Sequence, residues 1–267
     1  MIRDITIGQY VPGDSVIHRL DPRTKILLTL IFIISLFIIT KFSGYLIAAV
    51  FLFGTIYLSK VPVKYMFKGL KGVLVILLIT VIINMFMTPG RVLWSFLFLK
   101  ITYEGLRQAA FMALRLTFLI VGTSLLTLTT PPIVMTDGIE YFLQPFKRVG
   151  VPAHELAMMM TIALRFIPTL MDETDKIMKA QMARGADFES GNVLNRAKSM
   201  VPLLVPLFIS AFRRADELAV AMEARCYRGG QGRTRLHKLE YERSDYIAFF
   251  FVCLMVGLII WNRYWIW

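Results

Sequence analysis

One short pattern occurs twice in this chain, as DKIMKAQMARG at residues 175–185 and as DELAVAMEARC at residues 216–226. In each copy an aspartate is followed at the same offsets by two alanines and an arginine. If both stretches are helical, the first alanine and the arginine share one face, because they are four residues apart. The repeat therefore predicts two similar helix ends, each with a fixed cation, Arg184 or Arg225, beside small residues.

The two arginines allow two interpretations. In the first interpretation the arginines are ordinary C-terminal caps. The helix dipole favours a cation at this end, which stabilises the helix by roughly a few tenths of a kcal/mol. The other is that each guanidinium enters an acidic groove on a partner and makes charge-assisted hydrogen bonds there. Other features of the sequence are needed to distinguish these two interpretations.

The composition indicates a membrane protein. The chain has 267 residues, of which 57% are hydrophobic, and a mean hydropathy of +0.63, whereas ordinary soluble domains are about 45–50% apolar. The net charge of +12 is compatible with nucleic-acid binding, but in a membrane protein basic residues also set topology and meet anionic lipid. The two cysteines and three histidines lack the spacing of a disulfide framework or a metal site, so neither is expected.

Apolar runs predict about five transmembrane helices. They lie near residues 22–39, 45–58, 73–87, 109–129 and 246–261. Asp21 is the expected N-cap of the first helix, with Pro22 in its first turn. Residues 91–103 read as an aromatic interfacial segment. Arg115 lies about two turns inside the fourth span and needs a partner, water or a protein-buried position.

The basic residues fix the expected orientation. They are concentrated before the first span, between the second and third spans and after the fourth. By the positive-inside rule, the N-terminus and residues 131–245 are cytoplasmic. The four lysines between spans two and three, Lys60, Lys64, Lys68 and Lys71, share one helix face, which we interpret as solvated or lipid-facing.

The region between spans four and five is too long for a structureless loop. We expect helices over residues 137–149, from Pro152 to Arg184 with Gly185 at the C′ position, and from about Val193 to Arg225. The last two could be read as further spans, but carboxylates occupy the second half of each. Long amphipathic helices lying partly along the membrane are therefore favoured.

The expected fold is thus an all-α membrane protein with about five transmembrane helices and about three long cytoplasmic or membrane-parallel coupling helices. Residues 1–130 form the N-terminal segment and four spans, residues 131–243 the cytoplasmic coupling region, and residues 244–267 the last span.

Enzymatic chemistry is not apparent in the sequence. Residues 229–232 are glycine-rich but lack the Gly-Lys-Ser/Thr ending that holds phosphates and magnesium, so the chain should not hydrolyse ATP itself. No catalytic residues and no cofactor are expected. The basic stretch 225–238 could bind nucleic acid, but just before a span it is more simply a lipid-facing, positive-inside segment.

The sequence resembles the transmembrane component of energy-coupling factor transporters, the EcfT family, which includes the related cobalt-transport subunit CbiQ. The matching features are the run from Ser15 to Lys25, the two Ala-Arg boxes, and the order of four spans, a helical region and a final span. The resemblance implies that the boxes dock on two ABC-type ATPase subunits. The residues in that role are Ala183, Arg184, Gly185, Ala224, Arg225 and Cys226. In the family the last residue of each box is small. Cys226 departs from this pattern, and we expect the departure to be tolerated.

By the same resemblance, the other partner is a small membrane protein that binds a vitamin or metal ion. ATP-driven motion of the ATPases would pass through the docked helices and tilt this subunit. The chain itself would be a multi-pass protein of the bacterial cell membrane, and no nucleic-acid partner is expected. Methionines such as Met158, Met159 and Met160 suit either an adaptable docking surface or ordinary core filling. The alternatives are an ABC permease with its own substrate path, or a membrane-anchored binder of nucleic acid or anionic lipid.

Overall fold

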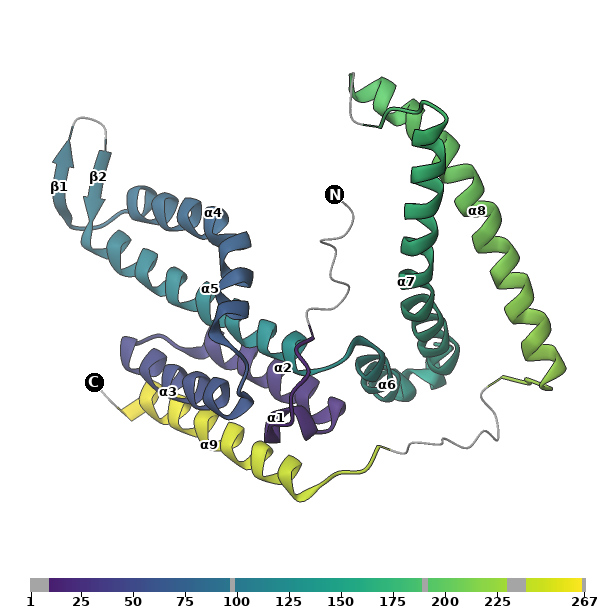
Figure 1. Cartoon of the computed structure of the whole chain (residues 1–267). Helices are drawn as coiled ribbons and strands as arrows, with labels where there is room; N and C mark the ends of the chain where they lie inside the picture. The colour runs from purple at the N-terminus through teal and green to yellow at the C-terminus, as the bar shows by residue number, and fades with distance from the viewer. Residues whose placement is uncertain (1–9, 97–98, 189–191, 230–238, 266–267) are drawn as a thin grey trace. The chain divides into compact units, whose positions relative to one another are not determined.

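The computed structural model of the chain describes residues 10–96, 99–188, 192–229 and 239–265, and the statements below refer to these (Figure 1). The chain divides into two compact units. The first unit in the chain comprises the described residues of Thr6–Gly138 and of His237–Trp267, and we call it the membrane unit. The second, which we call the coupling unit, comprises those of Ile139–Leu236. Each unit is described by itself.

The membrane unit is built mainly from helices. They are α1 (Val16–Arg19), α2 (Pro22–Ile38), α3 (Phe42–Ser59), α4 (Val63–Met87), α5 (Tyr103–Thr129) and α9 (Arg243–Trp265). Among the described residues, four helices are long and apolar enough to cross a membrane: α3, α4, α5 and α9. The first predicted span, α2, has 17 residues, one fewer than α3, and so lies at the short end of the range of about 17–25 residues that spans a bilayer core. The predicted all-α membrane class is confirmed.

The core of the membrane unit joins helices from both ends of the chain. Leu36 of α2, Ala48 of α3 and Ile259 of α9 are almost completely buried, and Phe111 of α5 packs in the same cluster. The predicted cap of α2 is confirmed, because the Asp21 side chain accepts a hydrogen bond from the Arg23 backbone N–H.

The connection between α4 and α5 is an antiparallel hairpin of β1 (Val92–Phe96) and β2 (Leu99–Thr102), which the prediction of an interfacial segment over residues 91–103 did not specify. A register irregularity lies between Val92 and Trp94. Residues 97 and 98, part of the predicted aromatic segment, are outside the described residues. The third span also begins earlier than predicted, at Val63, so that α4 includes three of the four lysines of the basic face.

The coupling unit holds two long helices, α7 (Ala153–Ala183) and α8 (Val193–Ala224), which run antiparallel (Figure 1). The single helix predicted over 137–149 is instead α6 (Pro132–Leu143), which crosses the division between the units, followed by the 3-10 turn η2 (Gln144–Val149). Pro152 is the N-cap of α7 rather than part of its first turn. Proline lacks the N–H that an interior helical position would use, so both positions suit it.

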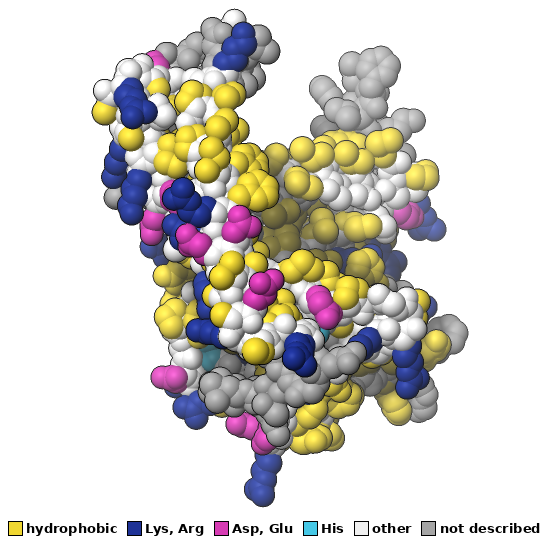
Figure 2. Space-filling model, turned by 90° about the vertical axis from the view of Figure 1, so that its right-hand side faces the viewer, with side chains coloured by type: hydrophobic (Ala, Val, Ile, Leu, Met, Phe, Trp, Pro, Cys, Tyr) yellow, Lys and Arg dark blue, Asp and Glu magenta, His cyan; other side chains and the backbone are white. Residues whose placement is uncertain are grey.

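Many large apolar side chains are exposed on both units, a pattern typical of surfaces that meet lipid or other proteins. Figure 2 shows hydrophobic side chains interspersed with lysine, arginine and acidic side chains on the side of the molecule where α8 lies.

Candidate functional site

Helix α7 ends in a Schellman motif. Arg184 is the C-cap, and Gly185 follows with a φ of 88°. The Gly185 N–H donates to the Met182 carbonyl at 2.9 Å, and the Ala186 N–H donates to the Gln181 carbonyl at 3.0 Å. These bonds satisfy the last carbonyls and stop the helix directly after the arginine. The predicted role of Gly185 at C′ is confirmed.

Helix α8 ends in the same way. Arg225 is the C-cap, and Cys226 takes the left-handed position with a φ of 56°. The Cys226 N–H donates to the Glu223 carbonyl at 2.8 Å, and the Tyr227 N–H donates to the Met222 carbonyl at 3.0 Å. The repeated sequence pattern is therefore a repeated structural motif, with cysteine where the first copy has glycine.

The residues of both boxes are exposed: Ala183, Arg184, Gly185, Ala224, Arg225 and Cys226. Within the described part of the chain, neither guanidinium makes a hydrogen bond or an ion pair with another side chain. Both cations are therefore free to meet a carboxylate on another molecule.

The two arginines lie at opposite ends of the α7–α8 pair (Figure 1). Gln181 Nε2 donates to the Pro202 carbonyl at 3.3 Å, which places the end of α7 beside the first turns of α8. Arg225 lies 23 residues after Pro202, and Arg184 lies three residues after Gln181 in the opposite direction. At 1.5 Å per residue, the two helix ends are separated by roughly 40 Å.

A proline explains why that carbonyl is available. Pro206 lies four residues after Pro202 and has no N–H with which to close the helical hydrogen bond. The Pro202 carbonyl would otherwise have no donor in the helix, and the Gln181 amide supplies one from α7. The missing N–H of Pro206 thus makes possible a contact between the two helices.

A second polar contact joins the two helices at Glu173. Its Oε1 accepts a hydrogen bond from Ser210 Oγ at 2.5 Å, and its Oε2 pairs with Arg214 at 2.9 Å. The Ser210 hydroxyl and then the Arg214 guanidinium lower the pKa of the Glu173 carboxyl, because both stabilise its charged form. Sequence analysis noted Glu173 only as one of several carboxylates and did not assign these partners.

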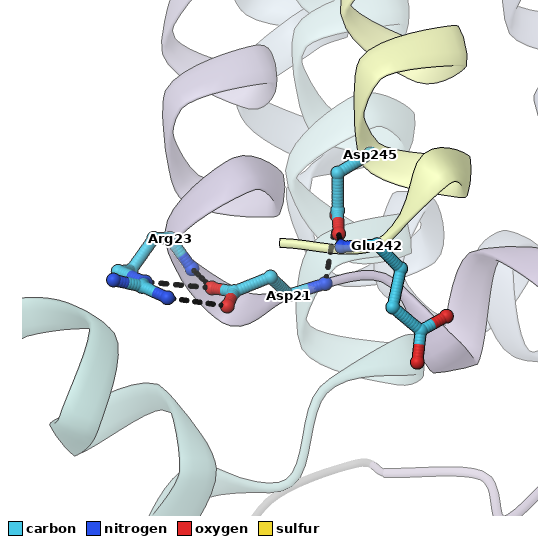
Figure 3. A network of polar contacts seen from close by, with 4 residues as sticks. All are labelled: Asp21, Arg23, Glu242 and Asp245. Atoms are coloured by element: carbon cyan, nitrogen blue, oxygen red, sulfur yellow. Dashed lines mark hydrogen bonds and ion pairs between the residues drawn. The ribbon is translucent and has the colours of Figure 1, made fainter. Parts of the chain in front are cut away.

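Polar residues of the run from Ser15 to Lys25 are buried in the membrane unit: Ser15, Asp21, Arg23, Thr24 and Lys25. Figure 3 shows two of them, Asp21 and Arg23, with their contacts. The Asp21 carboxylate pairs with Arg23, whose Nε and terminal nitrogen donate at 3.0 and 2.9 Å. The Arg23 guanidinium also lies 4.4 Å from the centroid of the Tyr241 ring. The run is therefore an ordered structural element held by its own charges.

Asp245, in the first turn of α9, connects this run to the last helix. Its Oδ1 accepts from the Asp21 backbone N–H and its Oδ2 from the Glu242 N–H, both at 2.9 Å (Figure 3). An acidic residue at the third helical position that reaches back to the N-cap is half of a capping box. That spacing was the signal available in the sequence for Asp245, which sequence analysis missed.

The boxes belong to the coupling unit, and the N-terminal run belongs to the membrane unit. The basic stretch 225–238 is described only as far as residue 229, so residues 230–238 lie outside the described part.

Apolar spanning helices, a separate pair of long amphipathic helices and two exposed arginine-bearing helix ends define a polytopic helical membrane protein with a second compact helical unit. Residues 13–236 match the family model CbiQ, described as cobalt transport protein. The chain therefore belongs to the EcfT/CbiQ family of transporter membrane proteins, which confirms the resemblance drawn from the N-terminal run and the two boxes.

Curated relatives match over nearly the whole chain. A protein of Clostridium kluyveri is 62% identical over 99% of this chain and 99% of its own length. One of Thermosediminibacter oceani is 63% identical over 98% and 99%, and one of Bacillus subtilis is 49% identical over 98% and 100%. All three are named energy-coupling factor transporter transmembrane protein EcfT.

Proposed function

We propose that this chain is the coupling subunit of an importer, with α7 and α8 docking through Arg184 and Arg225 on two ABC-type ATPase subunits. The observation that carries the proposal is the pair of similar helix ends, each with an exposed arginine whose side chain has no partner among the described residues. A guanidinium presents a fixed fork of donors that suits a carboxylate in a groove. Two similar ends suit a partner that offers two similar sites.

The separation of the arginines supports two docking points rather than one. Guanidinium groups roughly 40 Å apart cannot enter the same groove, but they can reach two subunits that lie side by side. Movement of those subunits would pull on both ends of the α7–α8 pair. The polar contacts at Glu173 and Gln181 couple the two helices, so that they respond together.

An apolar stripe on α8 supports contact with a second kind of partner. Its members recur at helical spacing on one face and are exposed: Val201, Leu204, Val205, Phe208 and Phe212. We propose that this stripe contacts a small membrane subunit that binds a vitamin or metal ion. ATP hydrolysis, which we assign to the partner ATPases, would tilt that subunit through α8.

The proposed orientation places the N-terminus and the coupling unit in the cytoplasm of a bacterial cell. It is supported by the clustering of basic residues at the corresponding ends of the spans. In a variant lacking the native cysteines, Asp14→Cys should react with a membrane-impermeant maleimide in inside-out vesicles and not in intact cells. Labelling in intact cells would contradict this orientation.

The docking role is tested by Arg184→Ala combined with Arg225→Ala. The double variant should fail to retain the ATPase subunits on affinity purification from membranes and should lose uptake, because each docking point loses its cation. Each single variant should retain one of the two ATPases weakly. ATPases that remain bound to the double variant at physiological salt would overturn the proposal.

A matched control changes two other exposed arginines, one on each helix. Arg165→Ala combined with Arg213→Ala removes the same charge from α7 and α8 without touching either box. This variant should retain both ATPases. If it loses them equally, net charge rather than the helix ends governs association.

A further inference from the structure

A cavity of ≈ 390 Å³ lies in the membrane unit, at the end opposite the Asp21–Asp245 network. Its walls come from the residues that follow α2 and α4 and from the first turns of α5. Figure 1 shows the end of α4 and the start of α5 side by side below the hairpin. The polar residues that line the cavity are Thr40, Thr88, Glu104, Arg107, Gln108 and Arg115.

Two guanidinium groups line this cavity, and each lies near an aromatic ring. The Arg107 guanidinium carbon is 5.5 Å from the centroid of Phe111, and that of Arg115 is 5.3 Å from the centroid of Phe37. Contact with a ring face leaves the in-plane N–H groups of a guanidinium available. Among the described residues, Arg115 makes one hydrogen bond, in which its Nε donates to the Tyr45 hydroxyl at 3.2 Å.

The charges that face the cavity do not balance. Glu104 is its single acidic lining residue, and one oxygen of that carboxylate already accepts the Arg91 backbone N–H at 2.7 Å. Within the described residues neither Arg107 nor Arg115 forms an ion pair with a carboxylate. The lining therefore carries two cations against one partly engaged anion.

The excess positive charge lies partly within a membrane-spanning helix. Arg115 lies two turns beyond Arg107 on α5, a helix apolar enough to span the membrane. A cation within a span is costly unless it meets an anion or water. Guanidinium forks match the oxygens of a phosphate group, and phosphates are abundant at the surface of a bilayer.

We propose that this cavity binds a phosphate oxyanion, held mainly by Arg107 and Arg115 with the Gln108 amide as a further donor. The phosphate can belong to the headgroup of a membrane phospholipid or be free in solution, and the chemistry of recognition is the same for both. Binding would neutralise the two arginines and fix the ends of α2, α4 and α5 against one another.

The test is native mass spectrometry on the full chain purified in detergent. Dioleoylphosphatidylglycerol is the probe, dioleoylglycerol supplies the same acyl chains without phosphate, and inorganic phosphate is the competitor. The native chain should retain phosphatidylglycerol and not dioleoylglycerol. Arg107→Gln and Arg115→Gln should each weaken retention by about 10-fold, because each removes a charged hydrogen-bond donor.

Arg263→Gln is the matched control. Arg263 is an exposed arginine near the end of α9, with its guanidinium 5.9 Å from the Tyr264 ring centroid. It lies at the same end of the membrane unit, since Ser43 at the start of α3 donates to Asn262 at 2.8 Å, but it does not line the cavity. Its replacement should leave retention unchanged.

The outcomes separate the sources of phosphate. Arginine-dependent retention that inorganic phosphate does not displace assigns the site to a lipid headgroup, and displacement assigns it to free phosphate. Arg115→Gln also loses the hydrogen bond to Tyr45, so circular dichroism checks its fold, and the exposed Arg107 decides the test if that variant misfolds. Retention by Arg107→Gln equal to that of the native chain, or no binding of either phosphate probe by the native chain, overturns the proposal.

Discussion

At the scale of single residues, Cys226 occupies a backbone conformation that suits glycine better. Its φ of 56° puts a side chain in the left-handed region, which costs an L-residue roughly 1–2 kcal/mol. Cys226→Gly should therefore stabilise the end of α8 by about 1 kcal/mol, part of the gain being offset by the freedom of glycine in the unfolded chain. Hydrogen exchange of the Tyr227 amide, which bonds the Met222 carbonyl, should slow about fivefold.

The reciprocal change at the other helix end gives the control. Gly185 has a φ of 88° and open space around the position of a Cβ, so Gly185→Ala introduces backbone strain without a clash. It should speed exchange of the Ala186 amide by a similar factor. Faster exchange in Cys226→Gly would show that the cysteine side chain makes a compensating contact.

These two residues also show how far local sequence predicts structure. Gly185 was predicted at C′ because glycine is the usual residue for the left-handed position. Cysteine has no such preference, so the left-handed conformation of Cys226 was not predicted, although it lies at the matching position of the repeat. The hairpin at Val92–Thr102 was missed because a short apolar, aromatic segment beside a span is equally typical of a membrane interface.

At the scale of elements, the contact between α7 and α8 depends on the charge of Glu173. Its pKa is lowered in the folded chain, first by Ser210 and then by Arg214, so the contact is fully present above the ordinary glutamate pKa of about 4.3 and is lost as the pH falls through the lowered value. Glu173→Gln should cost a few tenths to about 1 kcal/mol at pH 7, since both side chains are partly exposed.

The measurement is the thermal unfolding midpoint of the full chain in detergent, taken at pH 7 and at progressively lower pH. The difference between the native chain and Glu173→Gln should shrink as the pH falls and vanish once Glu173 is protonated. Asp172→Asn is the control, because Asp172 is an exposed neighbour on α7 with no ion pair among the described residues. A pH-independent difference at Glu173 would argue against the charged contact.

The existence of α7 and α8 could be predicted from their apolar period and end signals, but their register could not. Which residue of α7 faces Ser210 or Pro202 is decided by packing between two helices, each of which has several polar residues in its second half. Sequence spacing within one helix contains no information on that choice.

At the scale of the whole molecule, the membrane unit closes through a contact between residues 21 and 245. The apolar spans could be located from the sequence, and the capping-box spacing could have indicated the bond from Asp245 to Glu242, but nothing local indicated that Asp245 also accepts from the N-terminal run. Contacts between residues so distant in sequence arise only when α2 and α9 pack together in the common core.

Asp245→Ala tests how much the contact between residues 21 and 245 contributes to the stability of the folded chain. The change leaves the buried Asp21 N–H without its acceptor, and an unsatisfied buried group of this kind costs about 1–3 kcal/mol. The Glu242 N–H loses its bond as well, but Glu242 is exposed, so water can take the place of the aspartate there. The thermal unfolding midpoint of the full chain in detergent should fall clearly, and Asp245→Asn should fall less because its amide oxygen can still accept one bond. Glu242→Ala keeps the same backbone N–H and removes only an exposed neighbouring carboxylate, so it should stay within about 0.5 kcal/mol of the native chain. Equal midpoints for Asp245→Ala and Glu242→Ala would mean that packing of α2 against α9, rather than the aspartate, holds the two ends of the membrane unit together.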